Sequence, residues 1–132
     1  TQVTGRFLDL SGDYETLSGV EFTGYEIHMG DSVRKGRAKP CTSVRDGVTG
    51  EEKTEGTFTE NVCGTYVHGI FDKEETALAL VRAAGEKKGV DVSRMEGVDF
   101  ASFKEQQYDI LAAELRKHLD MKKIYEILDC GV

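Results

Sequence analysis

The chain has 132 residues, of which 39% are apolar and 31% are charged, and its 24 acidic and 17 basic side chains give a net charge of −7. This length fits one domain or part of one, with enough chain to bury a core, and the acidic balance argues against binding to nucleic acid or to an anionic membrane. No apolar stretch approaches the ~20 residues that a membrane-spanning helix needs.

The first half of the chain predicts short strands separated by turns. Five strands are expected, near 1–8, 20–29, 41–46, 54–60 and 62–67, and the last of them runs into His68. The apolar phase of the second strand slips by one residue at Gly24, as a bulge or bend there would produce. Residues 30–40 are polar and basic, so they predict a loop that either meets an anionic ligand or partner or is simply solvated.

Helical patterns follow. Asp72, with Glu75 three residues later, resembles a capping box and predicts a helix that ends at Gly89. Its apolar stripe is expected at Ala77, Leu80, Val81 and Ala84. A second helix is expected near 100–118, and a third short amphipathic segment holds Ile124, Ile127 and Leu128. Strands followed by helices predict an α/β protein that is α+β within this chain.

Two of the three histidines stand at the predicted ends of strands, close to a glycine. His68 is a candidate general base and acid at the edge of a sheet, where open α/β folds place their sites. The alternative is a histidine whose ring satisfies backbone groups at the strand end. His28 shares a strand face with Glu26, so it either lines a cleft with that carboxylate or lies on the polar surface.

A complete pair of catalytic cysteine and histidine is not expected inside the chain. Cys63 lies five positions before His68, so in one straight strand the two side chains would point to opposite faces. Cys41 and Cys130 have no partner that the sequence identifies. An odd number of cysteines without CxxC spacing favours reduced thiols and a cytoplasmic protein. No spacing typical of metal ligands or of a phosphate-binding loop occurs, so no metal or cofactor is expected in this chain.

Three phrases, in order along the chain, carry a resemblance to a known family. They are GYEIHMG over 24–30, GTYVHGIFD over 64–72 and YDILAAELRKHLDMKKIYEIL over 108–128. Together they resemble the C-terminal half of the glutamine amidotransferase domain in the cobyric acid synthase family. GTYVHGIFD alone would be shared with the related cobyrinate diamide synthases, and the other two phrases narrow the match.

The resemblance implies a class I glutamine amidotransferase fold, a flavodoxin-like mixed sheet with C-terminal helices, that is incomplete in this chain. Residues 1–132 would form the C-terminal part of the domain, without the half that bears the nucleophilic cysteine and without the synthetase domain. His68 matches the catalytic histidine of the family, and Glu26, His28, Tyr66 and Gly69 are candidates to line the active site. Most class I enzymes carry a glutamate two places after the histidine. Ile70 stands there, so Glu26 is a candidate to orient the His68 ring.

The family uses glutamine and ATP to convert corrinoid carboxylates into amides, from adenosylcobyrinic acid a,c-diamide to cobyric acid, in cobalamin biosynthesis. Glutamine and the corrinoid are therefore the expected partners, with ATP and magnesium bound in the absent synthetase domain in cis. The isolated chain is expected to be inactive and to expose strand edges and apolar helix faces that favour self-association. Two alternatives stay open: a related amidotransferase acting on cobyrinate or on a cell-wall lipid-linked substrate, and a non-catalytic interaction domain that retains the fold.

Overall fold

The computed structural model describes residues 1–130, which fall into two units, Thr1–Val98 and a second that begins at Asp99. The first unit contains β1 (Gln2–Phe7), η1 (Gly12–Leu17, a 3-10 helix), β2 (Glu21–Glu26), β3 (Thr42–Asp46), β4 (Glu52–Glu55), β5 (Thr57–Thr59), β6 (Val62–Gly64), β7 (Val67–His68) and α1 (Glu74–Lys88). The second unit contains α2 (Phe100–His118) and α3 (Met121–Cys130). Within residues 1–130, no helix is long and apolar enough to span a membrane.

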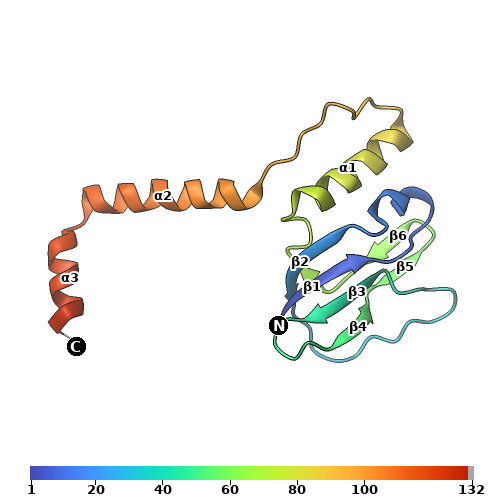
Figure 1. The fold of residues 1–132 in the computed structure, drawn as a ribbon, viewed down its shortest axis with the longest axis horizontal. Helices are drawn as coiled ribbons and strands as arrows, with labels where there is room; N and C mark the ends of the chain where they lie inside the picture. The colour runs from blue at the N-terminus through green and yellow to red at the C-terminus, as the bar shows by residue number, and fades with distance from the viewer. Residues whose placement is uncertain (131–132) are drawn as a thin grey trace. The chain divides into compact units, whose positions relative to one another are not determined.

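Five strands of the first unit form one sheet in the order β4-β3-β1-β2-β7 (Figure 1). Every pair in this sheet is antiparallel, and β5 and β6 form a separate two-stranded antiparallel sheet. The expected α+β class, with strands before helices, is confirmed. A flavodoxin-like mixed sheet is not seen within residues 1–130.

One face of the sheet carries the core. Alternate side chains of β1 and β2 are buried, whereas Thr4, Arg6 and Thr23 lie on the opposite, exposed face. The core cluster comprises Val3, Phe7, Leu10, Leu17, Phe22, Cys41, Val44, Phe58, Val67, Ile70 and Ala79. Because Leu17 comes from η1, Phe58 from β5 and Ala79 from α1, these three elements share the buried face of the sheet.

The predicted bulge at Gly24 is wrong. The ladder between β1 and β2 runs without interruption, with Val3 opposite Gly24 and Gln2 opposite Tyr25. Gly24 occupies an inward position in which a Cβ atom would lie 2.4 Å from the backbone oxygen of His68. The alternation of apolar residues changes phase because Tyr25 and Ile27 face outward and are more than half exposed. The inward-facing position 24 has room only for the hydrogen atom of glycine.

Two strands predicted as continuous are each divided. The expected strand over 54–60 breaks at Gly56, whose φ of 69° is left-handed and so favours glycine. The chain therefore leaves the large sheet after β4 and forms the β5–β6 hairpin. The strand expected over 62–67 also ends early, because residues 65 and 66 cross from β6 to β7.

Helix α1 begins and packs differently from the prediction. Its N-cap is Lys73, without a side-chain cap, and the predicted capping box at Asp72 does not form. Of the predicted stripe, Leu80 packs against the core and is partly buried, whereas Val81 and Ala84 are exposed. The fully buried positions are Thr76, Ala79, Ala83 and Gly85. These small side chains allow close approach to η1, where the Thr16 hydroxyl donates to the Ala79 carbonyl at 3.0 Å. Gly89 ends the helix with a φ of 66°, as predicted.

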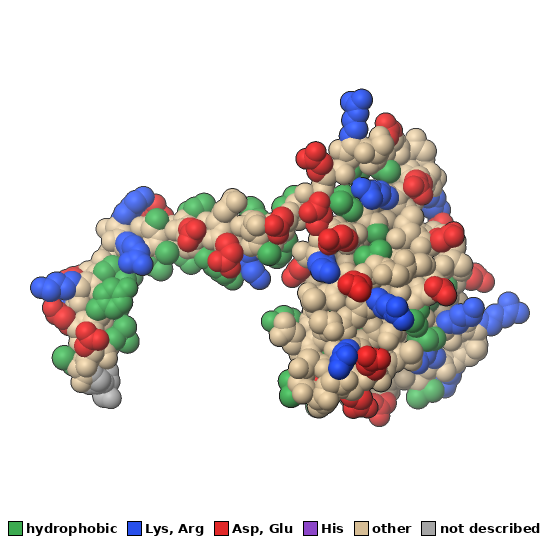
Figure 2. Space-filling view, in the orientation of Figure 1, with side chains coloured by type: hydrophobic (Ala, Val, Ile, Leu, Met, Phe, Trp, Pro, Cys, Tyr) green, Lys and Arg blue, Asp and Glu red, His purple; other side chains and the backbone are tan. Residues whose placement is uncertain are grey.

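The second unit consists of the two predicted helices. Asp99 caps α2 by accepting the Ser102 N–H at 3.1 Å, and Asp120 accepts the Lys123 N–H at 3.0 Å in the first turn of α3. Neither helix has a buried residue within the described range. Apolar side chains are therefore exposed along both helices, as the green atoms in Figure 2 show.

Candidate active site

His68 ends β7, the edge strand of the sheet. It lies opposite Tyr25 of β2 in an antiparallel pair, and Gly69 follows it with a φ of 76°, which stops the strand. The imidazole is exposed, and within residues 1–130 no side-chain hydrogen bond or ion pair holds it. The ring is therefore accessible to a reacting group.

A buried glutamate fixes the segment that leads into His68. Glu55, at the end of β4, is only 5% exposed. Its carboxylate accepts the Tyr66 N–H at 2.5 Å and the Thr65 hydroxyl at 2.6 Å, together with the Thr42 hydroxyl at 2.8 Å. Charge-assisted hydrogen bonds of this kind are strong, so Glu55 defines the path of the chain two residues before the histidine.

Sequence reasoning missed Glu55. The phrase Thr54-Glu55-Gly56-Thr57 reads as a polar strand, and nothing in it marks a buried carboxylate. Two of the donors to Glu55 follow it by ten residues or more and come back to it only through the β5–β6 hairpin.

A second buried carboxylate contacts a histidine and a lysine. The Glu26 side chain is 5% exposed and lies 2.9 Å from Nε2 of His28 and 3.0 Å from Nζ of Lys53. Burial alone would raise the pKa of Glu26, but the hydrogen bonds and charges of Lys53 and His28 outweigh it and hold the pKa below its usual 4.5. Glu26 is therefore an ionised acceptor at neutral pH.

His28 connects this pair to the segment before β7. Its ring stacks on the ring of Tyr66, with the centroids 4.6 Å apart, and its Nδ1 lies 2.9 Å from the Gly30 carbonyl. The Tyr66 hydroxyl in turn bonds the Ser32 hydroxyl at 2.5 Å. The start of the loop after β2 is thus attached to Tyr66, two residues from His68.

Glu26, His28 and Tyr66 line one cleft of about 450 Å³, together with Asp31, Arg34, Lys53 and Glu55. His68 and Gly69 do not line it, because Val67 pairs with Glu26 and His68 therefore projects to the other face of the sheet. This register corrects the suggestion that Glu26 orients His68, because the two side chains lie on opposite faces. The Glu26 carboxylate contacts His28 and Lys53 instead. Ile70, two places after the histidine, is 4% exposed in the core and cannot orient the ring.

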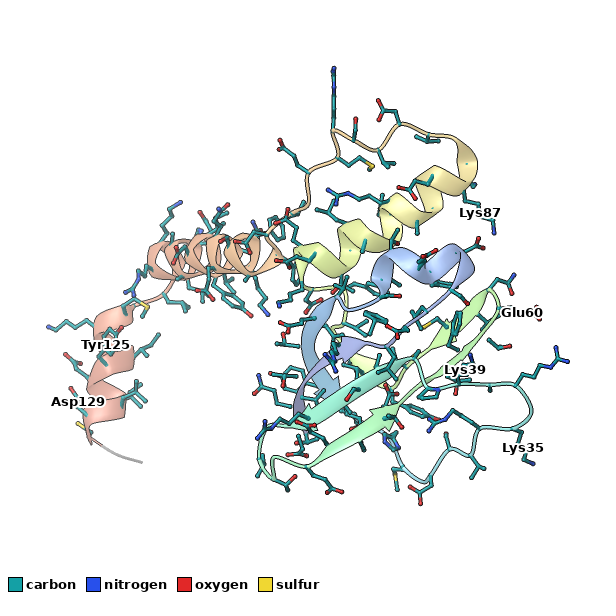
Figure 3. All side chains as sticks on the ribbon, turned by 45° about the vertical axis from the view of Figure 1, so that its right-hand side comes forward. Lys35, Lys39, Glu60, Lys87, Tyr125 and Asp129 are labelled. Carbon is teal, nitrogen blue, oxygen red and sulfur yellow. The ribbon has the colours of Figure 1, made fainter. Side chains whose placement is uncertain are left out.

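The basic loop over 30–40 is exposed, and Figure 3 shows Lys35 and Lys39 on it. Its Arg34 donates to the Gly56 carbonyl at 3.0 Å, which ties the loop to the turn after β4. An anionic ligand for this loop stays a prediction.

The cysteine thiols contact groups other than His68. Cys63 packs against the core cluster that contains Cys41, and Cys41 Sγ lies 3.2 Å from the Gly64 carbonyl. Cys130 is exposed at the end of α3. Among residues 1–130, no cluster of three or more histidine, cysteine or acidic side chains is arranged to hold a metal ion.

Comparison with known proteins gives one family and a consistent set of relatives. Residues 1–76 match the family described as the CobB/CobQ-like glutamine amidotransferase domain. A cobyric acid synthase of Ruminiclostridium cellulolyticum is 37% identical over 100% of the chain and 26% of its own length. Similar proteins of the same name occur in Lachnoclostridium phytofermentans (38% identical over 99% of the chain and 27% of its own length) and Citrobacter koseri (36%, 97% and 25%).

The chain spans about a quarter of the length of these curated relatives. No solved structure matches it.

Proposed function

The chain belongs to the CobB/CobQ-like glutamine amidotransferase family, and on this premise we propose that it is part of the glutaminase domain of a cobyric acid synthase. The observation that carries the proposal is the similarity to proteins of that name along 97–100% of the chain. The proposed role is to supply ammonia from glutamine for ATP-dependent amidation of adenosylcobyrinic acid a,c-diamide to cobyric acid, in cobalamin biosynthesis.

In the proposed reaction His68 works with a cysteine thiol from outside this chain. His68 takes the thiol proton, and the thiolate attacks the side-chain amide carbon of glutamine. His68 then returns the proton to the departing ammonia, and afterwards deprotonates the water that hydrolyses the thioester to glutamate. The exposed ring at a strand end, behind a segment fixed by Glu55, supports this role.

The rest of the proposal concerns the whole protein. The antiparallel sheet would be continued by further strands into a flavodoxin-like domain, and β7 is the edge nearest to the proposed chemistry. ATP and magnesium would act in a synthetase domain in cis, where the carboxylate is activated, and the enzyme would work in the cytoplasm. The chain alone would lack its nucleophile and would not hydrolyse glutamine.

The test is the His68→Ala substitution in the full-length enzyme. We expect glutamine-dependent amidation to fall by a factor on the order of 10²–10⁴, the usual contribution of a general acid or base. Turnover with added free ammonia should be retained, because ammonia bypasses the glutaminase step. Formation of the amidated corrinoid with each nitrogen donor is the measurement.

The matched control is His118→Ala, which removes a histidine that is 76% exposed on α2. We expect both nitrogen donors to support its normal turnover. Equal loss of both activities in His68→Ala would show that His68 is structural, and ammonia release from glutamine by the isolated 132-residue chain would contradict the need for an outside thiol. If the full-length enzyme amidates cobyrinate or a lipid-linked substrate instead of the a,c-diamide, it is one of the related amidotransferases rather than a cobyric acid synthase.

A further inference from the structure

Cys41 and Cys63 form a thiol pair that the proposed glutaminase reaction does not use. Cys41 lies directly before β3 and is fully buried, and Cys63 lies in the middle of β6 and is half-buried. Cys63 packs against the core cluster that contains Cys41, and the two thiols lie near enough for each to shift the pKa of the other. The 3.2 Å contact of Cys41 Sγ with the Gly64 carbonyl independently brings Cys41 to the residue next to Cys63.

The surrounding backbone leaves space for the Cys41 sulfur. At Gly56 an added Cβ atom would lie 2.4 Å from Cys41 Sγ and 2.5 Å from the Gly64 carbonyl oxygen. The backbone of Gly56 therefore lines one side of a narrow slot around the sulfur, and the Gly64 carbonyl lines another side. The Cys41 thiol is held in this slot beside Cys63.

The two cysteines differ in reactivity. The thiolate is the form that reacts with oxidants, and the hydrogen bond from Cys41 lowers the pKa of Cys63 although burial opposes it. The same hydrogen bond, together with burial, raises the pKa of Cys41. Cys63 is also the more accessible of the two, so it meets an oxidant first.

We propose that Cys63 and Cys41 are a redox modification site, in which hydrogen peroxide or another hydroperoxide converts the pair into an intramolecular disulfide. The Cys63 thiolate attacks one peroxide oxygen, which forms a sulfenic acid and releases hydroxide. The Cys41 sulfur then displaces the sulfenic hydroxyl. The Cys41 proton and this hydroxyl leave as water, so each peroxide is reduced by two electrons as two thiols become one disulfide.

The disulfide would act on the segment before His68. It would join the start of β3 to β6, directly before the residues of the crossing segment that Glu55 holds. β6 would then be attached to the residue before β3 covalently as well as by the contact between Cys41 Sγ and the Gly64 carbonyl. The inference stands without the proposed glutaminase function, because it requires only the folded first unit.

The test uses the full-length protein carrying Cys130→Ser, which removes the exposed thiol of α3 and leaves the core unchanged. After treatment with hydrogen peroxide, the protein is alkylated and digested with trypsin without reduction. Cleavage gives peptide 38–45 with Cys41 and peptide 54–73 with Cys63. We expect these two peptides to be recovered joined, at the sum of their masses less two hydrogen atoms, and to separate on addition of dithiothreitol.

Cys63→Ser is the matched variant, because the half-buried position tolerates the smaller hydroxyl. We expect its peptide 38–45 to stay unoxidised under the same conditions, since Cys41 reacts only with an oxidised Cys63. Recovery of the wild-type Cys63 peptide alone, either unmodified or as a sulfinic acid, would overturn the proposal. Oxidation of Cys41 in Cys63→Ser at the wild-type rate would overturn the assigned order of reaction.

Discussion

Glu55 shows how one side chain can determine the path of the segment that leads into His68. Its buried carboxylate is surrounded by neutral donors, two hydroxyls and a backbone N–H, and no cation among residues 1–130 pairs with it. The carboxylate is therefore held by hydrogen bonds from neutral groups, and its loss would leave the three donors without their acceptor.

We expect Glu55→Gln to lower the free energy of unfolding by about 2–4 kcal/mol, because an amide keeps one acceptor oxygen and brings an N–H₂ group toward existing donors. Urea denaturation followed by circular dichroism measures the loss. Glu52→Gln is the control on the same strand. Its side chain is 67% exposed and lies 3.7 Å from Arg45, so we expect a change within about 0.5 kcal/mol. Similar values for the two variants would contradict the role of Glu55.

Glu26 predicts a dependence of stability on pH. Its pKa in the folded state lies below 4.5, despite burial, because of Lys53 and His28. A lowered pKa contributes stability that is fully present above the unfolded value and is lost as the pH falls through the folded value. We expect the stability difference between the wild type and Glu26→Gln to be constant above about pH 5 and to shrink below pH 4.5.

Unfolding titrations from pH 3 to 7 check this expectation. Lys53→Gln removes one of the two interactions that lower the pKa and should give an intermediate profile. A difference between the wild type and Glu26→Gln that does not change with pH would mean that the Glu26 pKa is the same in the folded and unfolded states.

At the scale of elements, the contact between β2 and β7 depends on Gly24. The two strands pair over only two positions, Tyr25 with His68 and Glu26 with Val67. A side chain at Gly24 would meet Val67 Cγ1 at 2.5 Å in addition to the His68 backbone. The position of His68 therefore requires the absence of a Cβ atom at residue 24.

We expect Gly24→Ala to destabilise the protein by about 1–3 kcal/mol, the usual cost of overpacking, and to speed hydrogen exchange at the β2–β7 pair. Gly64→Ala is the control, because its added Cβ atom would have no neighbour within 4 Å. Hydrogen exchange and urea denaturation of both variants measure the effects. Unchanged exchange in Gly24→Ala would show that the strands separate easily to admit a side chain.

The sequence predicted most elements but not their interruptions. Alternation located β1 and β3, helical periodicity located α2, and the glycine stop signal located the end of α1 at Gly89. Alternation could not show that Gly56 adopts a left-handed conformation, because a glycine inside a polar strand gives the same pattern. The stripe of α1 was only partly right: Leu80 packs against the core, but the fully buried Ala79 and Ala83 each precede a predicted position by one residue. Hydrophobicity does not distinguish these alanines from Ala77 and Ala84.

The candidate site was predictable only in part, for a related reason. The strand end and the following glycine marked His68, and the period of a strand correctly put His28 on the same face as Glu26. The contacts of Glu55 with Tyr66, and of Cys41 with Cys63, join residues that meet only after the chain has turned at Gly56. Such contacts leave no periodic signal along the sequence.

At the scale of the whole molecule, the unburied helices are the dominant feature. Tyr108, Leu111, Leu115 and Leu119 are 45–56% exposed along α2. Exposed apolar stripes of this kind mark surfaces that associate. This supports the prediction that the isolated chain associates with itself.

We expect the isolated chain to sediment as concentration-dependent oligomers, and Leu111→Glu with Leu115→Glu to shift it toward monomer, because charge on the stripe opposes burial. The matched control, Gln106→Glu with Ala113→Glu, places the same two charges on the opposite side of the helix and should leave association unchanged. Sedimentation velocity over a range of concentrations is the measurement. Equal shifts in both variants would assign the effect to net charge rather than to the stripe.

The hairpin of β5 and β6 begins directly after β4 and returns to it, and Cys41 and Glu55 contact Gly64 and Thr65 where β6 ends. Its tip, around Glu60 with a φ of 45°, contacts η1 instead, where the Tyr14 hydroxyl donates to the Asn61 carbonyl at 3.2 Å. Extra residues at the tip would lengthen the excursion without displacing the stems, so this is where the unit can acquire new surface while its histidine stays in register.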